Sequence, residues 1–300
     1  MSPSNIALAD GGMETVLLFH DGFDLPCFAA FPLVGDERGR AALTRYFEPF
    51  LDTAQERGMP FVLDTPTWRA NPDWGRQLGY DEDALAAANA DAVAFVRGLG
   101  EGRSDVTING VLGPRGDGYV VEQRMSADEA AEYHAWQIGV LSDAGVERIT
   151  ALTLTYPEEA TGVVQAAAAA GVPVVPAFTV ETDGRLPDGT SVGNAVERVD
   201  AATGGVAEFF MLHCAHPTHI AAGLEDSDAL ERIGGLRFNA SALSHAELDE
   251  AEELDEGDPA ALARDSTALR ERLPALQLLG GCCGTDHRHV AEIAAAWGGA

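Results

Sequence analysis

The chain has 300 residues, 46% of them hydrophobic, and its 48 acidic and 19 basic side chains give a formal net charge of −29. This length is enough for one large domain or two small ones. So negative a charge excludes nucleic acid as a partner, because phosphate contacts need a basic surface, and it argues against binding to anionic membranes.

The acidic side chains are interpreted as a solvated surface. Their densest run is HAELDEAEELDEGD at 245–258, and the sequence contains no lysine. Such a surface fits either a high-salt cytoplasm or a GC-rich genome, and the sequence leaves both open. No apolar stretch is long enough to span a membrane, and residues 1–12 lack the pattern of a secretory signal. Four cysteines without regular spacing indicate a reducing cytoplasm.

Short apolar runs alternate along the chain with alanine-rich amphipathic stretches. In chain order, the runs predict strands at 6–10, 60–64, 106–112, 148–154, 173–180, 207–214, 236–240 and 276–281. The stretches between them predict helices, among them 40–58, 126–145, 158–171 and 258–273. The helix at 126–145 begins with Ser126 and Glu129 at the spacing of a capping box and ends at Gly145.

Eight strand–helix units of this kind predict an α/β protein with a closed (β/α)8 barrel, a TIM barrel, formed as a single domain by residues 1–300. A doubly wound open sheet is the alternative. Such a sheet usually has a glycine-rich phosphate-binding turn after its first strand, and ADGGMET at 9–15 does not spell one. In a barrel the functional residues are expected at the C-terminal ends of the strands.

Three of the four cysteines fall at those ends. Cys214 closes the sixth predicted strand, and Cys282 and Cys283 follow the eighth. Neighbouring cysteines can simply be small residues that pack under a glycine-rich turn, but a second interpretation is that both thiolates bind one soft metal ion. With Cys214 as third ligand, the set suits Zn²⁺ with one coordination position open. Three thiolates make such a centre a poor activator of water but a suitable holder of a substrate thiol.

Other candidate ligands are interpreted more conservatively. Cys27 lies in a loop after the first strand and is expected to be a packed thiol. The histidines beside the cysteines are expected to support the site or to begin helices rather than to bind metal, with Pro217 and Thr285 or Asp286 marking helix starts. These histidines are His213, His216, His219, His287 and His289.

With these residues in hand, the chain resembles the homocysteine S-methyltransferase family of zinc-dependent barrels. The resemblance rests on DGG at 10–12, GVLGPRGD at 110–117, YHAWQI at 133–138, the cysteine at 214 and GGCCG at 280–284. It implies that Cys214, Cys282 and Cys283 bind zinc and act through the zinc-bound substrate thiolate. It also implies that Asp10, Gly11 and Gly12 line the pocket of the amino-acid acceptor.

The sequence departs from the family at two positions. His213 stands before the sixth-strand cysteine, where the family commonly has asparagine. Thr153 stands at the end of the fourth strand, where the family usually has a glutamate that holds the acceptor's ammonium group. We therefore expect Thr153 to contact the acceptor but to bind its ammonium group weakly.

The resemblance implies methyl transfer from a small sulfonium or quaternary ammonium donor to a thiol, with homocysteine giving methionine. Trp68 and Trp74 are candidates for cation–π contact with the donor. Both can equally be hydrophobic anchors of their loop. The alternative functions are a methyltransferase acting on another thiol and a non-catalytic zinc-binding or redox-sensing protein. The sequence does not fix the donor or the oligomeric state, and it allows a homo-oligomer.

Overall fold

The computed structural model describes residues 6–121, 123–224 and 227–298, so the predicted domain bounds of 1–300 extend beyond the described residues. It shows one closed barrel in which each strand pairs with the next. The strands are β1 Ala7–Leu8, β2 Phe61–Asp64, β3 Val106–Leu112, β4 Arg148–Leu154, β5 Val174–Phe178, β6 Phe210–Ala215, β7 Ile233–Phe238 and β8 Leu278–Gly281.

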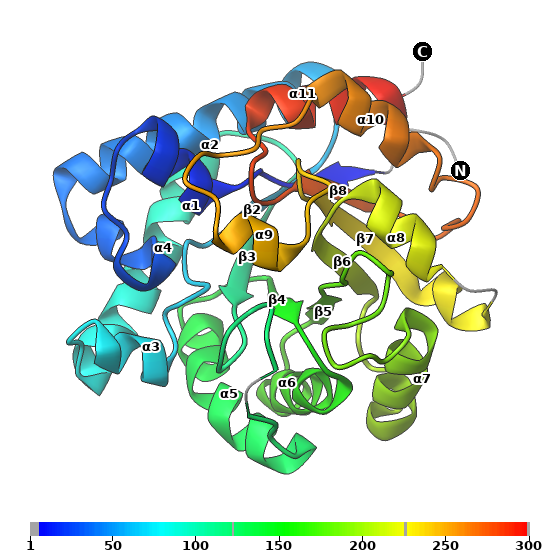
Figure 1. Ribbon diagram of the computed structural model, residues 1–300. Coiled ribbons are helices and arrows are strands. Elements are labelled where there is room, and N and C mark those ends of the chain that lie inside the picture. The colour runs from blue at the N-terminus through cyan, green and yellow to red at the C-terminus, as the bar shows by residue number, and fades with distance from the viewer. Residues whose placement is uncertain (1–5, 122, 225–226, 299–300) are drawn as a thin grey trace.

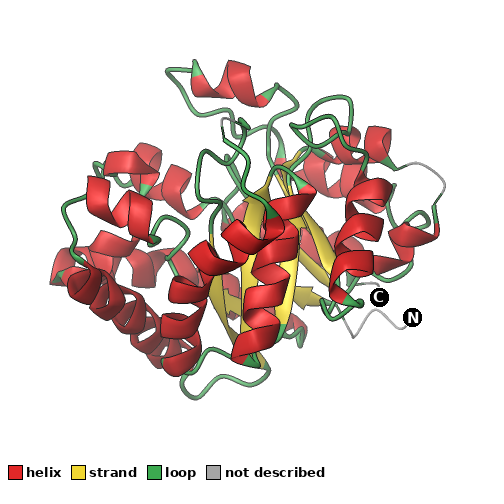
Figure 2. Ribbon diagram, turned by 90° about the horizontal axis from the view of Figure 1, so that it is seen from below, coloured by secondary structure: helices red, strands yellow, loops and turns green. Residues whose placement is uncertain are grey.

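Every strand pair is parallel, and β1 closes the barrel by pairing with β8 through Ala7 and Leu278. The predicted (β/α)8 barrel is therefore confirmed. Helices surround the strands in Figure 1, and Figure 2 shows the same enclosure from the side. They are α1 Met13–Thr15, α2 Glu37–Arg57, α3 Pro72–Gln77, α4 Glu82–Gly100, α5 Ala127–Asp143, α6 Pro157–Ala170, α7 Val192–Thr203, α8 Pro217–Gly223, α9 His245–Asp249, α10 Pro259–Thr267 and α11 His287–Trp297.

The helix-start signals of the sequence act as predicted. Ser126 and Glu129 form a complete capping box on α5, and Gly171 ends α6 in the left-handed conformation. Asp286 caps α11, which resolves the choice between Thr285 and Asp286. Among the described residues, none of the helices combines the length and the apolar character that crossing a bilayer would require.

Most predicted elements differ from the observed ones by a few residues at their ends, and two of the differences have an evident physical reason. The strand predicted at 236–240 is β7 and begins earlier, at Ile233. Gly234 and Gly235 weaken the strand pattern there, yet the fold needs small residues, because a Cβ on Gly234 would lie 2.6 Å from the Phe209 ring. The helix predicted at 258–273 ends at Thr267, beyond which the backbone continues in tighter turns with bonds to the third preceding residue.

The core has two layers, as a barrel surrounded by helices requires. The larger apolar cluster lies between the strands and the helices, and a smaller one fills the barrel interior, with Val62, Val111 and Leu152 among its members. Polar side chains share the interior: Asn109 donates to Asp64 at 2.6 Å and accepts from Thr150 at 2.9 Å. Asp64 is thereby held at the carboxyl end of β2.

Candidate active site

The fold brings the three predicted cysteines together at the carboxyl ends of β6 and β8. One sulfur atom from each of Cys214, Cys282 and Cys283 lies within 4.8 Å of the other two. The vicinal pair points the same way, with 3.9 Å between the two sulfurs, and all three are free thiols. Cys27 is not part of this group.

A backbone irregularity directs Cys214 into the cluster. The pairing register of β6 shifts between His213 and Ala215, and Cys214 between them has a φ of 56°. The same feature occurs in β4, where the register shifts between Ala151 and Leu154 and Thr153 has a φ of 57°. Left-handed backbone is unfavourable for any residue with a Cβ and more so for a β-branched one. Bulges therefore present these two side chains at the mouth of the barrel.

The pKa values of the three thiols are shifted in different directions. Burial raises the pKa of Cys214, but hydrogen bonds from the Cys282 and Cys283 thiols outweigh it and bring the pKa well below its usual value. For Cys282, burial and the bond to Cys214 raise the pKa, and for Cys283 the bond to Cys214 is the largest cause of its raised pKa. Of these three thiols, Cys214 therefore ionises most readily.

Polar groups around Cys214 hold its sulfur in place. The Tyr119 hydroxyl donates to Cys214 Sγ at 3.2 Å, and the Asn239 amide nitrogen lies 3.6 Å from the same atom. The Tyr119 ring packs on His245 with 4.4 Å between ring centroids, and His245 Nε2 lies 2.9 Å from the Cys214 carbonyl oxygen. These donors favour a negatively charged sulfur.

The residues fit a soft divalent cation. Three sulfurs converge in a buried place, and no basic side chain is among the groups that hydrogen-bond to Cys214 Sγ in the described part of the chain. Thiolate sulfur is the ligand type that selects zinc over magnesium or calcium. Three protein ligands without a fourth are typical of catalytic rather than structural zinc sites.

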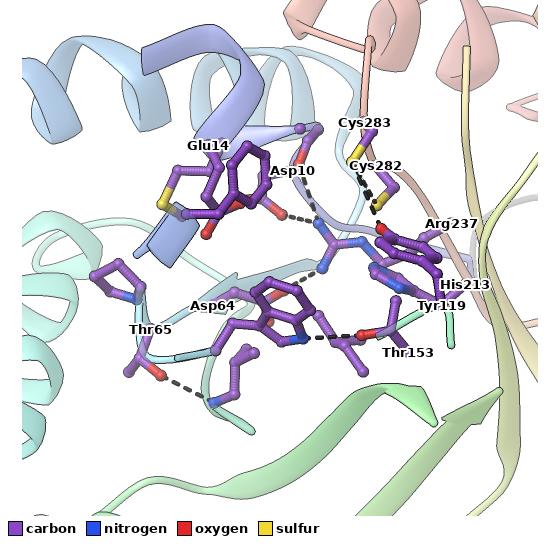
Figure 3. A pocket seen from close by; sticks show the side chains of 18 residues that line it. Asp10, Glu14, Asp64, Thr65, Tyr119, Thr153, His213, Arg237, Cys282 and Cys283 are labelled. Carbon is purple, nitrogen blue, oxygen red and sulfur yellow. Dashed lines mark hydrogen bonds and ion pairs between the residues drawn. The ribbon is translucent and has the colours of Figure 1, made fainter. Parts of the chain in front are cut away.

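A pocket opens beside the cysteines in the mouth of the barrel (Figure 3). It is lined by residues from both ends of the chain and from β2, β3, β4, β6 and β7, including Asp10, Gly11, Gly12, Glu14, Phe28, Asp64, Trp68, Tyr119, Thr153, His213, Arg237, Cys282 and Cys283. The structure therefore places every predicted acceptor residue at this pocket. Trp74 is not among the lining residues.

Gly11 and Gly12 are needed for close packing against the cysteine loop. A Cβ on Gly11 would lie 2.8 Å from the carbonyl oxygen of Thr285, and one on Gly12 would lie 2.5 Å from that of Cys282. Contacts this short do not occur for real Cβ atoms, so a side chain at Gly12 would displace Cys282, and one at Gly11 would displace Thr285 of the same loop. The glycines thus position the candidate ligands as well as lining the pocket.

Asp10 lines the pocket, but its carboxylate is already engaged. Arg237 lies between Asp10 and Asp64 and forms an ion pair with each. Its Nε donates to the Gly281 carbonyl oxygen at 2.9 Å, and Tyr46 donates to the second oxygen of Asp10 at 3.0 Å. Burial raises the pKa of Asp10 to about 6 even though Arg237 opposes the shift. Two carboxyl groups and one guanidinium thus form one buried cluster.

Trp68 contacts Thr153 and an arginine. Its indole Nε1 donates to Thr153 Oγ1 at 2.9 Å. The Arg69 guanidinium carbon lies 3.9 Å from the Trp68 ring centroid and 4.1 Å from that of Trp74, and Arg69 donates to the Gly116 carbonyl oxygen. The cation that contacts these two indoles is thus a side chain of the protein itself.

Glu14, in the first turn of α1, is the remaining carboxylate of the pocket. Apart from its own backbone amide, its carboxylate has no hydrogen-bond or ion-pair partner among the residues that the structure describes. Burial raises the pKa of Glu14 to about 7, and the charge of Asp10 adds to the shift. The group is therefore poised between its two protonation states near neutral pH.

The histidines take the supporting positions expected of them. His216 caps α8, His287 is the first residue of α11, and His289 completes the capping box with Asp286. His219 bonds to the Ala242 carbonyl oxygen at 3.0 Å. His213 lines the pocket, and burial lowers its pKa to about 3, which keeps the ring neutral.

Four residues around the site were not predicted from the sequence: Glu14, Tyr119, Arg237 and His245. The sequence contains a signal for two of them. Glu14 lies inside the quoted ADGGMET turn, and Arg237 is a charged residue within an otherwise apolar strand, where it must have a buried partner. Tyr119 lies in a loop and His245 is the first residue of α9, and nothing in their spacing points to Cys214.

Comparisons with known proteins identify the family of the chain and support its fold. Residues 7–297 match the family model described as homocysteine S-methyltransferase. No curated protein sequence matches the chain. The crystal structure of the homocysteine methyltransferase MmuM from Escherichia coli in its metallated form is similar, with a TM-score of 0.74 at 20% identity over 97% of this chain and 96% of that one. The oxidised form gives 0.73 at 21% identity with the same coverage. At these identities the likeness establishes the fold.

Proposed function

The chain belongs to the homocysteine S-methyltransferase family and is an enzyme of methyl transfer to homocysteine, and we propose that it uses a zinc ion and a small cationic methyl donor. Cys214, Cys282 and Cys283 would hold the zinc. The single observation that carries this proposal is the convergence of the three sulfurs beside a pocket in the barrel mouth.

When bound, zinc supplies the positive charge that ionises a neighbouring thiol at neutral pH, where a free thiol with a pKa of about 8.5 is mostly protonated. The protein's part is to hold the three sulfurs so that one position faces the pocket. Gly11 and Gly12 allow the cysteine loop to approach the first strand, and Tyr119 and Asn239 hold Cys214 by hydrogen bonds.

The charge of the pocket favours a cationic donor. Its lining contains three carboxylates, those of Asp10, Glu14 and Asp64, against the one guanidinium of Arg237. The cationic centre of a sulfonium or quaternary ammonium donor is drawn to such a pocket and loses its positive charge when the methyl group leaves. In the reaction, the acceptor sulfur forms a bond to the methyl carbon while the bond from that carbon to the donor's sulfur or nitrogen breaks, and the electron pair stays with the donor.

The alternative of a non-catalytic zinc-binding or redox-sensing protein gains no support from the site. A sensor needs an exposed thiol of low pKa, whereas the one thiol with a lowered pKa, Cys214, is fully buried. A reducing cytoplasm, which would keep the thiols available for zinc, is part of the proposal.

The test is a screen of methyl donors. Zinc-loaded protein is incubated with homocysteine and with S-methylmethionine, betaine or another small sulfonium or quaternary ammonium compound, and methionine is measured by mass spectrometry. We expect methionine from at least one donor, and none from the Cys214→Ser variant. Equal methionine from wild type and variant, or none with any cationic donor, would refute the proposal.

A further inference from the structure

The pocket presents three carboxylates, of which two are committed within the protein. Arg237 pairs with Asp10 and with Asp64 and balances part of their charge. Glu14 has no such counter-charge: outside its own backbone amide, its carboxylate has no partner among the described residues. It is also partly accessible, whereas Asp10 and Asp64 are 1% and 4% exposed. Glu14 is therefore the carboxylate that a substrate can reach.

Thr153 is poorly suited to bind an ammonium group. Its hydroxyl oxygen already accepts the hydrogen bond of the Trp68 indole at 2.9 Å, and a neutral oxygen makes weaker bonds to a cation than a carboxylate does. The side chain is also confined, because a Cβ on Gly118 would lie only 3.3 Å from Thr153 Cβ. The Thr153 hydroxyl, which the sequence suggested for ammonium binding, thus has one of its two acceptor positions occupied by a structural contact.

The cations nearest to Glu14 are held elsewhere. Arg237 and Arg69 both act on Glu14 electrostatically. Arg237 is bound to its two aspartates, and Arg69 is stacked between Trp68 and Trp74. A desolvated carboxylate without a bound cation is costly, and that cost falls when a cationic ligand arrives.

The helix turn that carries Glu14 is tied to the cysteine loop. Gly12 N donates to the Thr285 carbonyl oxygen at 2.9 Å, and Gly284 N donates to Thr15 Oγ1 at 3.2 Å. Figure 3 shows Glu14 beside Asp10 on one side of the pocket and Cys282 and Cys283 on another. These bonds fix the turn that carries Glu14 relative to the candidate metal ligands, as recognition of a short amino-acid thiol requires.

We propose that the Glu14 carboxylate binds the α-ammonium group of the amino-acid acceptor, an assignment that rests on the proposed function. A primary ammonium group has N–H donors and forms charge-assisted hydrogen bonds with a carboxylate. The cationic centre of a sulfonium or quaternary ammonium donor has none. A donor such as S-methylmethionine has an α-ammonium group as well, and the bonds between the turn of Glu14 and the cysteine loop are what assign Glu14 to the acceptor. Glu14 thereby performs in this chain the task that Thr153 cannot perform.

The experiment compares two thiols that differ only in the amino group, homocysteine and 4-mercaptobutanoate. Their binding to zinc-loaded protein is measured by calorimetry without any methyl donor, for wild type and for Glu14→Gln. We expect wild type to prefer homocysteine by about tenfold or more, as a charge-assisted bond implies. Glu14→Gln should lose most of this preference by weakening homocysteine binding, with 4-mercaptobutanoate unchanged. The matched control is Glu132→Gln, which neutralises an exposed carboxylate on α5 outside the pocket and should behave as wild type.

Three results would overturn the assignment. They are a wild type without preference for homocysteine, a Glu14→Gln variant that keeps the preference, and a variant that weakens both thiols equally. Because binding is measured without a donor, the outcome is separate from that of the methylation screen. If Glu14→Gln loses the preference for homocysteine but wild type methylates nothing, the proposed function alone is refuted. If Glu14→Gln keeps the preference and wild type is active, the role of Glu14 alone is refuted.

Discussion

The indole Nε1 of Trp68 donates a hydrogen bond to Thr153 Oγ1 at 2.9 Å and so joins the end of β4 to the loop that follows β2. Thr153 holds this position with a φ of 57°, at a shift in the strand register. An unfavourable backbone conformation persists only where surrounding contacts enforce it. The contact with Trp68 therefore gives the Thr153 hydroxyl a structural role at the pocket wall.

Thr153→Val removes the acceptor of this bond and leaves the indole N–H unpaired. We expect a loss of about 1–2 kcal/mol in the free energy of unfolding, measured by urea denaturation. The preference for homocysteine over 4-mercaptobutanoate should stay within about twofold of wild type, because Glu14 carries it. Thr153→Ser keeps the hydroxyl and serves as the control. A collapse of the preference in Thr153→Val with Glu14 intact would show that the threonine binds the ammonium group after all.

Replacing Glu14 should stabilise the free protein at alkaline pH. The pKa of Glu14 rises on folding from 4.5 to about 7, so the folded state binds more protons than the unfolded state between these values. Stability from this group is present below pH 4.5 and is lost as the pH rises through 7. The Glu14→Gln variant has no carboxyl group at this position and therefore does not lose this stability as the pH rises. At pH 8 it should exceed wild type by on the order of 1–2 kcal/mol, after allowance for the solvent that reaches this group.

The measurement is chemical denaturation of both proteins at pH 5 and at pH 8. The difference at pH 5 should be a small part of that at pH 8, because the folded group is protonated there and only ionisation of the unfolded group contributes. Carboxylates outside the pocket titrate alike in the two proteins and cancel in the difference. A variant that is less stable than wild type at pH 8 would mean that Glu14 has a stabilising partner within the protein.

Zinc content tests the role of each cysteine separately. Purified protein should carry close to one zinc per chain, and replacing Cys214, Cys282 or Cys283 by serine should remove most of it. Cys27→Ser is the control, because Cys27 lies outside the cluster, and it should keep both zinc and activity. Zinc that survives the loss of Cys283 would contradict a three-sulfur site.

The acidic composition predicts a dependence on salt. At a formal net charge of −29, surface charges repel one another, and this repulsion is screened as ionic strength rises. The melting temperature should therefore increase by several degrees between low salt and molar KCl. Thermal scans in KCl measure this directly. A flat profile would favour genomic composition over a high-salt cytoplasm as the reason for the acidic surface.

Hydrophobic periodicity predicted the order and positions of the strands, because buried parallel strands have short, continuous apolar runs. The rule that barrel sites lie at strand ends then placed Cys214 with Cys282 and Cys283. The pairing of Arg237 with Asp10 and Asp64 could not be predicted, since it depends on which side chains meet across the closed barrel. Left-handed backbone at Thr153 and Cys214 also has no sequence signal, because neither residue type favours it.

The same limit applies to Glu14. Its residue type and its place after the first strand were visible in the sequence, but its lack of a partner was not. Only the structure shows that Arg237 is shared by two other carboxylates while Glu14 faces the pocket. The family resemblance suggested Thr153 as the position that contacts the acceptor's ammonium group, whereas the geometry of the pocket favours Glu14.

Whether three cysteines hold zinc, and whether this zinc binds the acceptor thiol, is tested by counting the sulfur atoms around zinc by X-ray absorption at the zinc edge, with and without homocysteine. We predict three sulfur ligands in the protein alone and a fourth when homocysteine is added. Fewer than three sulfurs in the protein alone, or a coordination shell that homocysteine leaves unchanged, would contradict it.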